Sequence, residues 1–385
     1  MNTGLAIANP NSGDATINFF FTDSDGTNSG NGILTLGANQ QIAKFLDQDP
    51  FNAAAGTLDT FTFSSSVPGA VVALRGFTNE RSEFLTMTLP VAPLTPGAGG
   101  TIFFPHFADG DGWKTDIVLV NPTDTTISGN VQFLDQGSDT AAVPLVLDDG
   151  TPGAGFAYSI PARSARRFKT SNPAGATSVG SVRATPAGGS TAPSGLGIFF
   201  FVSNGITVSE AGVPALPEGT GFRVYAEASG TPGEIGVIRS GVAITNVSNE
   251  SNTITLEITN LDGSPAGAAV TLSIPPAGQT ARFIDELFTL PSDFSGILRI
   301  SSTSSVAVVG LRSRVNQRGD FMITTTPPTK EAGPAVSSDL YFPHLDGSDG
   351  WSTQFVLFSG TAGQISAGLL HFLGQGGERL EVTVH

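Results

Sequence analysis

The sequence predicts an all-β protein built from tandem antiparallel β-sandwich modules in an A-B-A-B′ order, with the last module truncated. Apolar residues occur in short Val-, Ile- and Phe-rich runs that Gly, Pro, Asn, Asp and Ser separate, which is typical of many short strands. Long stretches of the chain also recur after 237 or 238 residues. The strongest helical pattern is a single turn at 285–287, because no stretch sustains a period of 3.6 residues.

The first module, A1, spans residues 1–95. Six apolar runs predict its strands, at 4–8, 15–21, 33–36, 42–45, 61–64 and 70–74. The same pattern returns in a third module, A2, at residues 222–333, where 241–246 repeats 4–9 at an offset of 237. A leading strand at 222–227 precedes this repeat in A2 but has no counterpart in A1, so we expect A1 to begin one strand late.

The second module, B1, spans residues 96–221. Its strands are expected at 117–120, 130–134, 157–160, 182–184 and 198–202. The fourth module, B2, at residues 334–385, repeats the start of B1 and contains about three strands. So few strands bury too little surface to stand alone, and we expect unpaired sheet edges at both ends of the chain.

One element of the B modules is written twice. The stretch 103–113, which reads Phe-Phe-Pro-His-Phe-Ala-Asp-Gly-Asp-Gly-Trp, returns at 341–351. Its imidazole and indole groups are candidate ligand-facing side chains: His106, Trp113, His344 and Trp351. In the alternative interpretation, Phe-Pro-His begins an edge strand and Trp covers one end of the sandwich. A motif that occurs in every copy of a module usually has a structural role.

The Asp-Gly turns of this element are candidate calcium sites. Their carboxylates belong to Asp109, Asp111, Asp346 and Asp349. Calcium takes six to eight oxygen ligands, but the bidentate Glu of an EF-hand loop is missing, and Asp-Gly is also a common tight-turn pair. Calcium is therefore the single candidate cofactor, and no other is expected.

A second charged set recurs in the A modules. It comprises Arg75, Arg81 and Glu83, repeated as Arg312, Arg318 and Asp320. Two arginines beside an acid would suit a carboxylate or phosphate clamp. Structural pairs that tie the last strand to a loop are the alternative.

Composition excludes several classes of partner. The net charge is −15 with only 18 Lys and Arg, which argues against nucleic acid and against anionic membrane surfaces. No cysteine is present, so disulfides and thiolate metal sites are excluded. We expect no membrane insertion, because no run of 18 apolar residues occurs, and the chain carries no signal-peptide pattern at its start.

Enzyme signatures are missing as well. The sequence has no Gly-x-Ser-x-Gly elbow, no His-Glu-x-x-His and no phosphate-binding loop. A pair of catalytic carboxylates is set by geometry rather than by spacing, so the sequence alone does not address it. We expect a protein that is not an enzyme.

The repeated motifs resemble the Ig-like β-sandwich modules of large secreted or surface proteins of environmental bacteria. The resemblance rests on 104–113, on Val120-Asn121-Pro122 and on 74–81. It implies an extracellular or cell-surface setting and no established activity. We therefore expect a non-catalytic structural or adhesive protein that binds itself head-to-tail, as a homo-oligomer or a filament formed by strand complementation, or binds other surface proteins. A secreted carbohydrate-binding module, with polysaccharide as its partner, is the alternative.

Overall fold

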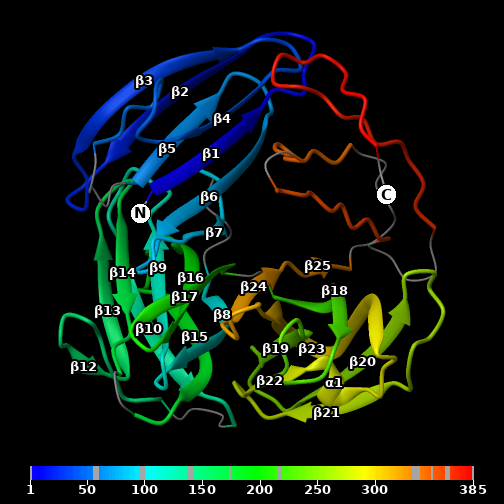
Figure 1. Ribbon diagram of the computed structural model, residues 1–385. Helices are drawn as coiled ribbons and strands as arrows, with labels where there is room; N and C mark the ends of the chain where they lie inside the picture. The colour runs from blue at the N-terminus through cyan, green and yellow to red at the C-terminus, as the bar shows by residue number, and fades with distance from the viewer. Residues whose placement is uncertain are drawn as a thin grey trace.

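The fold is almost entirely β, with 56% strand and 1% helix, and its sheets are antiparallel. The computed structural model describes residues 2–54, 60–94, 100–137, 142–172, 175–215, 218–331, 339–347, 350–359 and 365–383. Three sheet-bearing units and a C-terminal segment, residues 339–383, lie around a common centre, in an arrangement like that of a four-bladed propeller (Figure 1). No helix in these ranges is long and apolar enough to cross a membrane.

Unit 1 has two sheets that share one core. The first is ordered β4-β1-β6-β7 and contains β1 (Asn2–Ala8), β4 (Gln41–Phe45), β6 (Ala70–Thr78) and β7 (Phe84–Leu89). The second is ordered β3-β2-β5 and contains β2 (Ala15–Thr22), β3 (Asn28–Leu36) and β5 (Thr60–Ser65). Leu5 and Ile7 of β1 pack with Ile17 and Phe19 of β2 in this core. The six strands expected between residues 4 and 74 are confirmed.

Unit 2 repeats this two-sheet plan. Its first sheet, ordered β13-β10-β15-β8, contains β8 (Ile102–Asp109), β10 (Ile127–Asp135), β13 (Gly155–Ile160) and β15 (Ser178–Pro186). Its second, ordered β14-β9-β16-β17, contains β9 (Trp113–Val120), β14 (Ala165–Lys169), β16 (Ser194–Ser203) and β17 (Ile206–Pro214). The two-residue strands β11 (Leu145–Val146) and β12 (Pro152–Gly153) form a separate ribbon. Phe104 and Phe133 of the first sheet pack against Ile117 and Leu119 of the second.

Unit 3 is held together by one long strand, β23 (Asp293–Val315). Its first half pairs with β20 (Asn252–Asn260) and β18 (Gly219–Ser229), and its second half with β19 (Ile238–Asn246) and β24 (Phe321–Thr326). The remaining elements are β21 (Val270–Ile274), β22 (Gln279–Phe283), α1 (Ile284–Leu287) and β25 (Thr329–Lys330). The helix occupies the turn expected at 285–287.

One buried asparagine lies at or directly after the end of the first or second strand of each unit: Asn9, Asn121 and Asn246. Each side-chain amide donates to the carbonyl of the residue four positions further on and to two consecutive carbonyls of a later segment. Each side-chain oxygen accepts from the backbone N–H two positions on. Because a buried amide is costly without partners, this residue fixes the same turn in all three units.

The C-terminal segment departs from the sequence prediction of about three strands. Its described residues 339–347, 350–359 and 365–383 contain no strand, only an isolated bridge between Leu373 and Arg379. The physical reason lies in the pairing of unit 2, where β8, β9 and β10 never pair with one another but with β13, β14, β15 and β16. The described part of the segment holds no counterpart of those four partners, so its backbone makes only scattered hydrogen bonds, such as that from the N–H of Leu380 to the carbonyl of Phe372, and no sheet.

Candidate functional site: the joints between units

Unit 2 docks on unit 3 through the Pro-His motif. The side-chain amide of Gln279, the first residue of β22, donates to the Pro105 carbonyl at 3.2 Å and lies 3.1 Å from Nδ1 of His106. The backbone N–H of Gln279 donates to the Gln136 carbonyl at 2.8 Å. Thr245 adds a hydroxyl bond to the Pro105 carbonyl at 3.1 Å. We call this contact joint 2–3.

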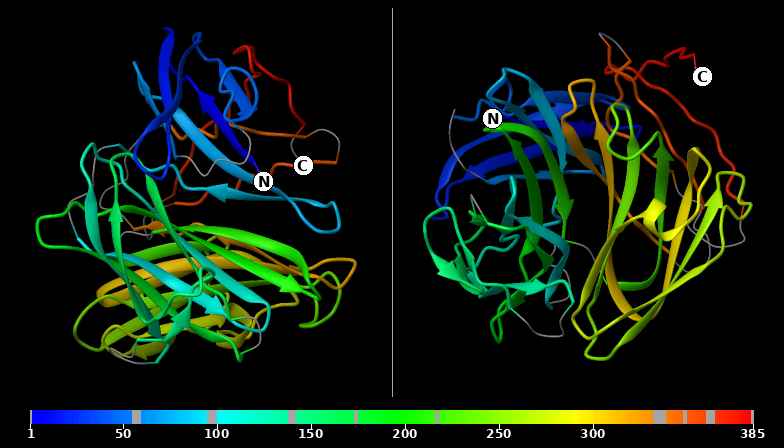
Figure 2. Two further views of the ribbon diagram at one scale, coloured as in Figure 1. Left: turned by 90° about the vertical axis from the view of Figure 1, so that its left-hand side faces the viewer. Right: turned by 60° about the horizontal axis from the view of Figure 1, so that its bottom comes forward.

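The C-terminal segment docks on unit 1 through counterparts of the three glutamine contacts of joint 2–3, and we call this contact joint C–1. The Gln41 amide donates to the Pro343 carbonyl at 2.8 Å and lies 3.3 Å from Nδ1 of His344. The backbone N–H of Gln41 donates to the Gln375 carbonyl at 3.0 Å. These residues lie 238 or 239 positions from their counterparts in joint 2–3. Both views in Figure 2 also place the segment alongside unit 1.

His106 acts within joint 2–3 as a neutral acceptor. Its ring centroid lies 5.6 Å from that of Phe199, and burial lowers the pKa of His106 to about 4. Since the Gln279 amide is a donor, Nδ1 accepts and the ring proton resides on Nε2. His106 therefore orients the joint at neutral pH.

Trp113 is also part of joint 2–3. Its ring lies 4.8 Å from that of Phe201 in unit 2 and 6.0 Å, edge to face, from that of Phe321 in unit 3. His106, Trp113 and Phe321 line an apolar pocket of about 280 Å³ between the two units. The counterparts of Trp113 and Phe321 at joint C–1 are largely exposed to solvent: Trp351 is 56% exposed and Phe84 is 52% exposed.

Unit 1 meets unit 2 through a buried ion pair. Arg75 of β6 donates from Nε and a terminal nitrogen to the two carboxylate oxygens of Glu210 on β17, at 2.9 and 3.0 Å. The Glu210 side chain is 2% exposed. Apolar contacts surround the pair, because Met87 of unit 1 packs with Ile198 and Phe200 of unit 2.

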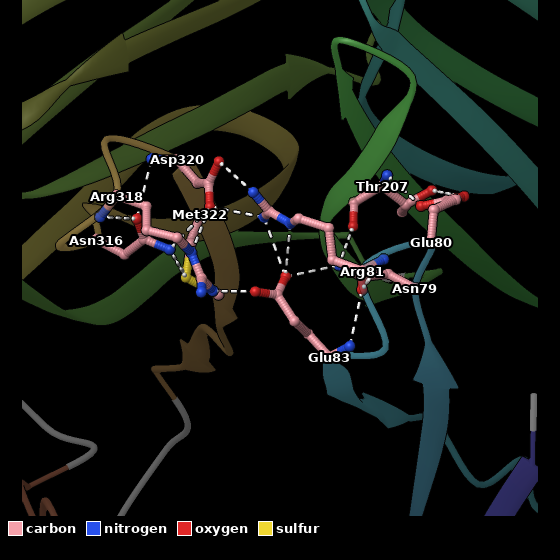
Figure 3. Close-up of polar contacts among 9 residues, drawn as sticks. All are labelled: Asn79, Glu80, Arg81, Glu83, Thr207, Asn316, Arg318, Asp320 and Met322. Atoms are coloured by element: carbon pink, nitrogen blue, oxygen red, sulfur yellow. Dashed lines mark hydrogen bonds and ion pairs between the residues drawn. The ribbon is translucent and has the colours of Figure 1, made fainter.

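Unit 1 also meets unit 3, at the centre of the molecule, through two repeated hairpin tips (Figure 3). Arg81 donates to both carboxylate oxygens of Asp320, at 2.7 and 3.4 Å, and Arg318 pairs with Glu83. The two pairs are counterparts, since Arg318 and Asp320 lie 237 positions after Arg81 and Glu83. An approximate twofold axis therefore relates the two tips.

Each hairpin tip is shaped by an asparagine. The Asn79 side-chain oxygen accepts from the backbone N–H groups of Arg81 and Glu83, and Asn316 does the same for Arg318 and Asp320. Hydrogen bonds from Asn79 lower the pKa of Glu83, and those from Arg81 lower the pKa of Asp320. Arg81, Glu83, Arg318 and Asp320 are thus paired between units 1 and 3, whereas Arg312 pairs with Glu227 within unit 3.

The same tip of unit 1 reaches unit 2. Glu80 accepts from the backbone N–H and the hydroxyl of Thr207, at 2.7 and 3.2 Å, and the Asn79 amide donates to the Thr207 carbonyl at 3.0 Å. The Thr207 backbone N–H is the largest cause of the lowered pKa of Glu80. One short hairpin therefore connects three units.

The structure does not gather the candidate calcium ligands. Asp109 is fully buried at the end of β8, where desolvation raises the pKa of its carboxyl, whereas Asp111 is exposed in a left-handed turn. The backbone N–H of Asp346 donates to the hydroxyl of Thr353, as the backbone N–H of Ala108 donates to the hydroxyl of Thr115. Asp349 lies outside the described residues. No group of three or more His, Asp or Glu side chains suited to a metal ion occurs in the described ranges.

Sequence reasoning missed the glutamines and Glu210. Gln41 and Gln279, like Gln136 and Gln375, recur at the offset of the repeat, and that recurrence of a polar residue is the signal that could have identified them. Glu210 has no repeated counterpart within the chain, so no such signal exists for it. No family model, curated protein or solved structure matches the chain.

Proposed function

We propose that the chain is a tandem array of Ig-like β-sandwich modules in the order A-B-A-B′, with residues 339–383 as the start of the second B module. The three equivalent asparagines support a common module. The matched contacts of joint 2–3 and joint C–1 support the duplication, since chance does not place the same glutamine, proline and histidine contacts at an offset of 238.

We further propose that the protein is a non-catalytic, extracellular structural or adhesive protein that assembles with itself or with other surface proteins. The observation that carries this proposal is the apolar surface of the C-terminal segment. Large apolar side chains of this segment are widely exposed: Leu340, Tyr341, Phe342, Trp351, Leu357, Ile365, Leu369, Leu370, Leu373, Leu380 and Val382.

Several of these positions correspond to core positions of unit 2. Ile365 is 98% exposed and its counterpart Ile127 is 1% exposed, while Leu357 is 53% exposed and Leu119 is fully buried. Exposed large apolar side chains in this number mark an interaction site, because burying each of them contributes about 1.5–3 kcal/mol. The contacts of joint C–1 provide a specific binding site for the segment on unit 1.

Head-to-tail assembly follows when the segment occupies unit 1 of the next chain instead of its own. The contact joins two different surfaces, so repeated exchange generates an open filament when the rotation between neighbouring chains does not close on itself. Light scattering and negative-stain electron microscopy on the full chain and on a version ending at residue 333 test this. We expect filaments from the full chain and monomers from the shorter one; monomers from both contradict assembly.

Charge substitutions provide a second test in the full chain. Ile365→Asp with Leu369→Asp places charges on the proposed surface and should abolish the filaments. Ile33→Asp is the matched control, since Ile33 is 68% exposed on β3 of unit 1. Equal loss of assembly in the control contradicts the assignment of the surface to the C-terminal segment.

A carbohydrate-binding module is the second candidate, and the exposed indole of Trp351 favours it. The packing of Trp113 against Phe201 and Phe321 makes Trp113 a poorer stacking platform. Glycan-array binding that falls after Trp351→Ala but not after Trp113→Ala would support this candidate. No binding by the parent chain to any glycan rejects it.

We propose that no cofactor is needed. Asp109 is held in a site that disfavours its charged form, and calcium affinity depends on the number of charged carboxylates among the ligands. The unfolding temperature should therefore be the same in calcium and in chelator. A rise of several degrees in millimolar calcium contradicts this proposal.

A further inference from the structure

Strand β5 of unit 1 is the edge of its sheet, whereas its counterpart in unit 3 is a central strand. β5 pairs with β2 on one side, and no described residue pairs with its other side. The counterpart is the first half of β23, whose pairing with β20 has the same register: Ile17 faces Ser65, and Ile254 faces Ser302, 237 positions later. On its other side, β23 pairs with β18.

β18 contributes a row of core side chains to unit 3. Its residues alternate between buried and partly exposed, and Phe222, Val224 and Ala226 enter the core. Phe222 lies opposite Ile300 and Val224 opposite Leu298, both of which are essentially fully buried. The alternation is that of a strand with one face on a core.

The corresponding side chains of unit 1 lack this cover. Phe63 and Phe61 occupy the positions of Ile300 and Leu298, yet both remain partly exposed on β5. An edge strand with partly exposed apolar side chains and unpaired backbone groups is a template for another strand. The free edge of β5 can therefore accept a strand in the position that β18 occupies beside β23 in unit 3.

The occupant follows from the connectivity of units 2 and 3. The chain that buries the core of unit 2, through β13 to β17, continues directly into β18. Joint C–1 sets the C-terminal segment on unit 1 as joint 2–3 sets unit 2 on unit 3. A partner polypeptide that covers the exposed apolar side chains of the segment would therefore place the strand that follows, the equivalent of β18, beside β5.

We propose that the free edge of β5 binds a β-strand of the β18 kind from a partner polypeptide, antiparallel and in the register that β18 has on β23. This rests on the proposed A-B-A-B′ duplication. The strand carries aliphatic or aromatic side chains at alternate positions, facing Phe61 and Phe63. Main-chain hydrogen bonds supply the pairing, and the alternate side chains supply the specificity.

One feature of β18 is not required of the partner strand. In unit 3 Glu227 of β18 accepts from Arg312 at 2.6 Å. The counterpart of Arg312 in unit 1 is Arg75, which Glu210 already engages. The acid at this position therefore contributes to β18 in its own unit but not to a strand on β5.

A labelled peptide with the sequence of β18, residues 219–229, is the probe, added to the full chain and followed by fluorescence anisotropy. We expect saturable binding, at least tenfold weaker for the Val224→Asp peptide and unchanged within twofold for the matched Glu227→Gln peptide. Absence of binding overturns the proposal, and so does equal binding by the Val224→Asp peptide.

Amide hydrogen exchange locates the bound peptide without altering the protein. Exchange at residues 60–65 should slow at least tenfold, while residues 297–302, already paired with β18, should not change. Protection elsewhere, with none at 60–65, overturns the proposal. Light scattering distinguishes the two proposals. If the chain is monomeric but the peptide still slows exchange in β5, self-assembly is refuted and the strand site stands. If filaments form but the peptide does not slow exchange in β5, the strand site is refuted and self-assembly stands.

Discussion

The buried Arg75–Glu210 pair should be the strongest polar contact between units 1 and 2. In Arg75→Met the Glu210 carboxylate loses two charge-assisted hydrogen bonds, of 2.9 and 3.0 Å, while it stays 2% exposed. Removing one partner of a buried pair costs about 3–5 kcal/mol, because an uncompensated charge stays behind. We therefore expect a loss of about 4 kcal/mol in the stability of this joint.

The double substitution Arg75→Met with Glu210→Leu should restore most of this stability. Both side chains would then be apolar, beside Met87, Ile198 and Phe200, and apolar replacement of a buried pair is often neutral. The double variant should therefore lie within about 1 kcal/mol of the parent chain.

Local amide exchange is the suitable assay, because a single unfolding free energy is not defined for a chain of several units. A loss of 4 kcal/mol corresponds to exchange about a thousandfold faster in β6 and β17 of Arg75→Met, since about 1.4 kcal/mol is a factor of ten. Exchange within threefold of the parent chain would refute a buried pair. Equal acceleration in the single and double variants would refute the argument from uncompensated charge.

Three further predictions follow from the other contacts. Burial lowers the pKa of His106 to about 4, so the stability that the neutral imidazole contributes is complete above pH 6.5 and is lost as the pH falls toward 4. This contribution is at most about 3 kcal/mol. Calorimetry of His106→Gln should therefore show a melting temperature that depends less on pH than that of the parent chain. Arg81→Ala should accelerate amide exchange in the two hairpin tips only slightly, and less still in high salt, since this pair with Asp320 is partly exposed. Acceleration as large as that expected for Arg75→Met would contradict a screened contact. Asn121→Ala should cost about 2–4 kcal/mol, because three backbone carbonyls lose their donor, whereas Asn11→Ala, where the side chain is partly exposed, should cost under about 1 kcal/mol. Similar melting shifts for both would contradict the role of the buried amide.

The sequence predicted the strands of the fold well, because alternating apolar runs and turn residues are local signals. The position of Phe61–Phe63 on β5 or of Val182 on β15 needs no knowledge of the rest of the chain. The absence of strands from the described residues of the C-terminal segment was not predictable in this way, since three strand-like segments form strands only when their partners are present. Pairing is a property of two segments, and periodicity describes one.

The candidate site was predicted in part. His106 and Trp113 were identified by their repetition, and both lie in joint 2–3, but which surface they meet depends on Gln279, 173 residues later in the chain. Asp109 and Asp111 were candidate ligands of one calcium site, with Asp346 and Asp349 as their counterparts in the repeat, yet Asp109 points into a core and Asp111 into solvent. Spacing along a turn does not determine which side of the strand each side chain faces.

Joint C–1 is the contact on which the proposed assembly depends, and cysteine cross-linking tests it most directly. The N–H of Gln41 bonds to the Gln375 carbonyl, and the N–H of Gln279 bonds to the Gln136 carbonyl, so each pair brings two backbones within disulfide reach. The parent chain has no cysteine that would interfere. The variant Gln279→Cys with Gln136→Cys is the matched control and should link within one chain.

For Gln41→Cys with Gln375→Cys, we predict a ladder of disulfide-linked dimers, trimers and larger species whose share rises with protein concentration. Links confined to single chains at every concentration would contradict assembly through joint C–1. The absence of any link, while the control links fully, would contradict the joint itself.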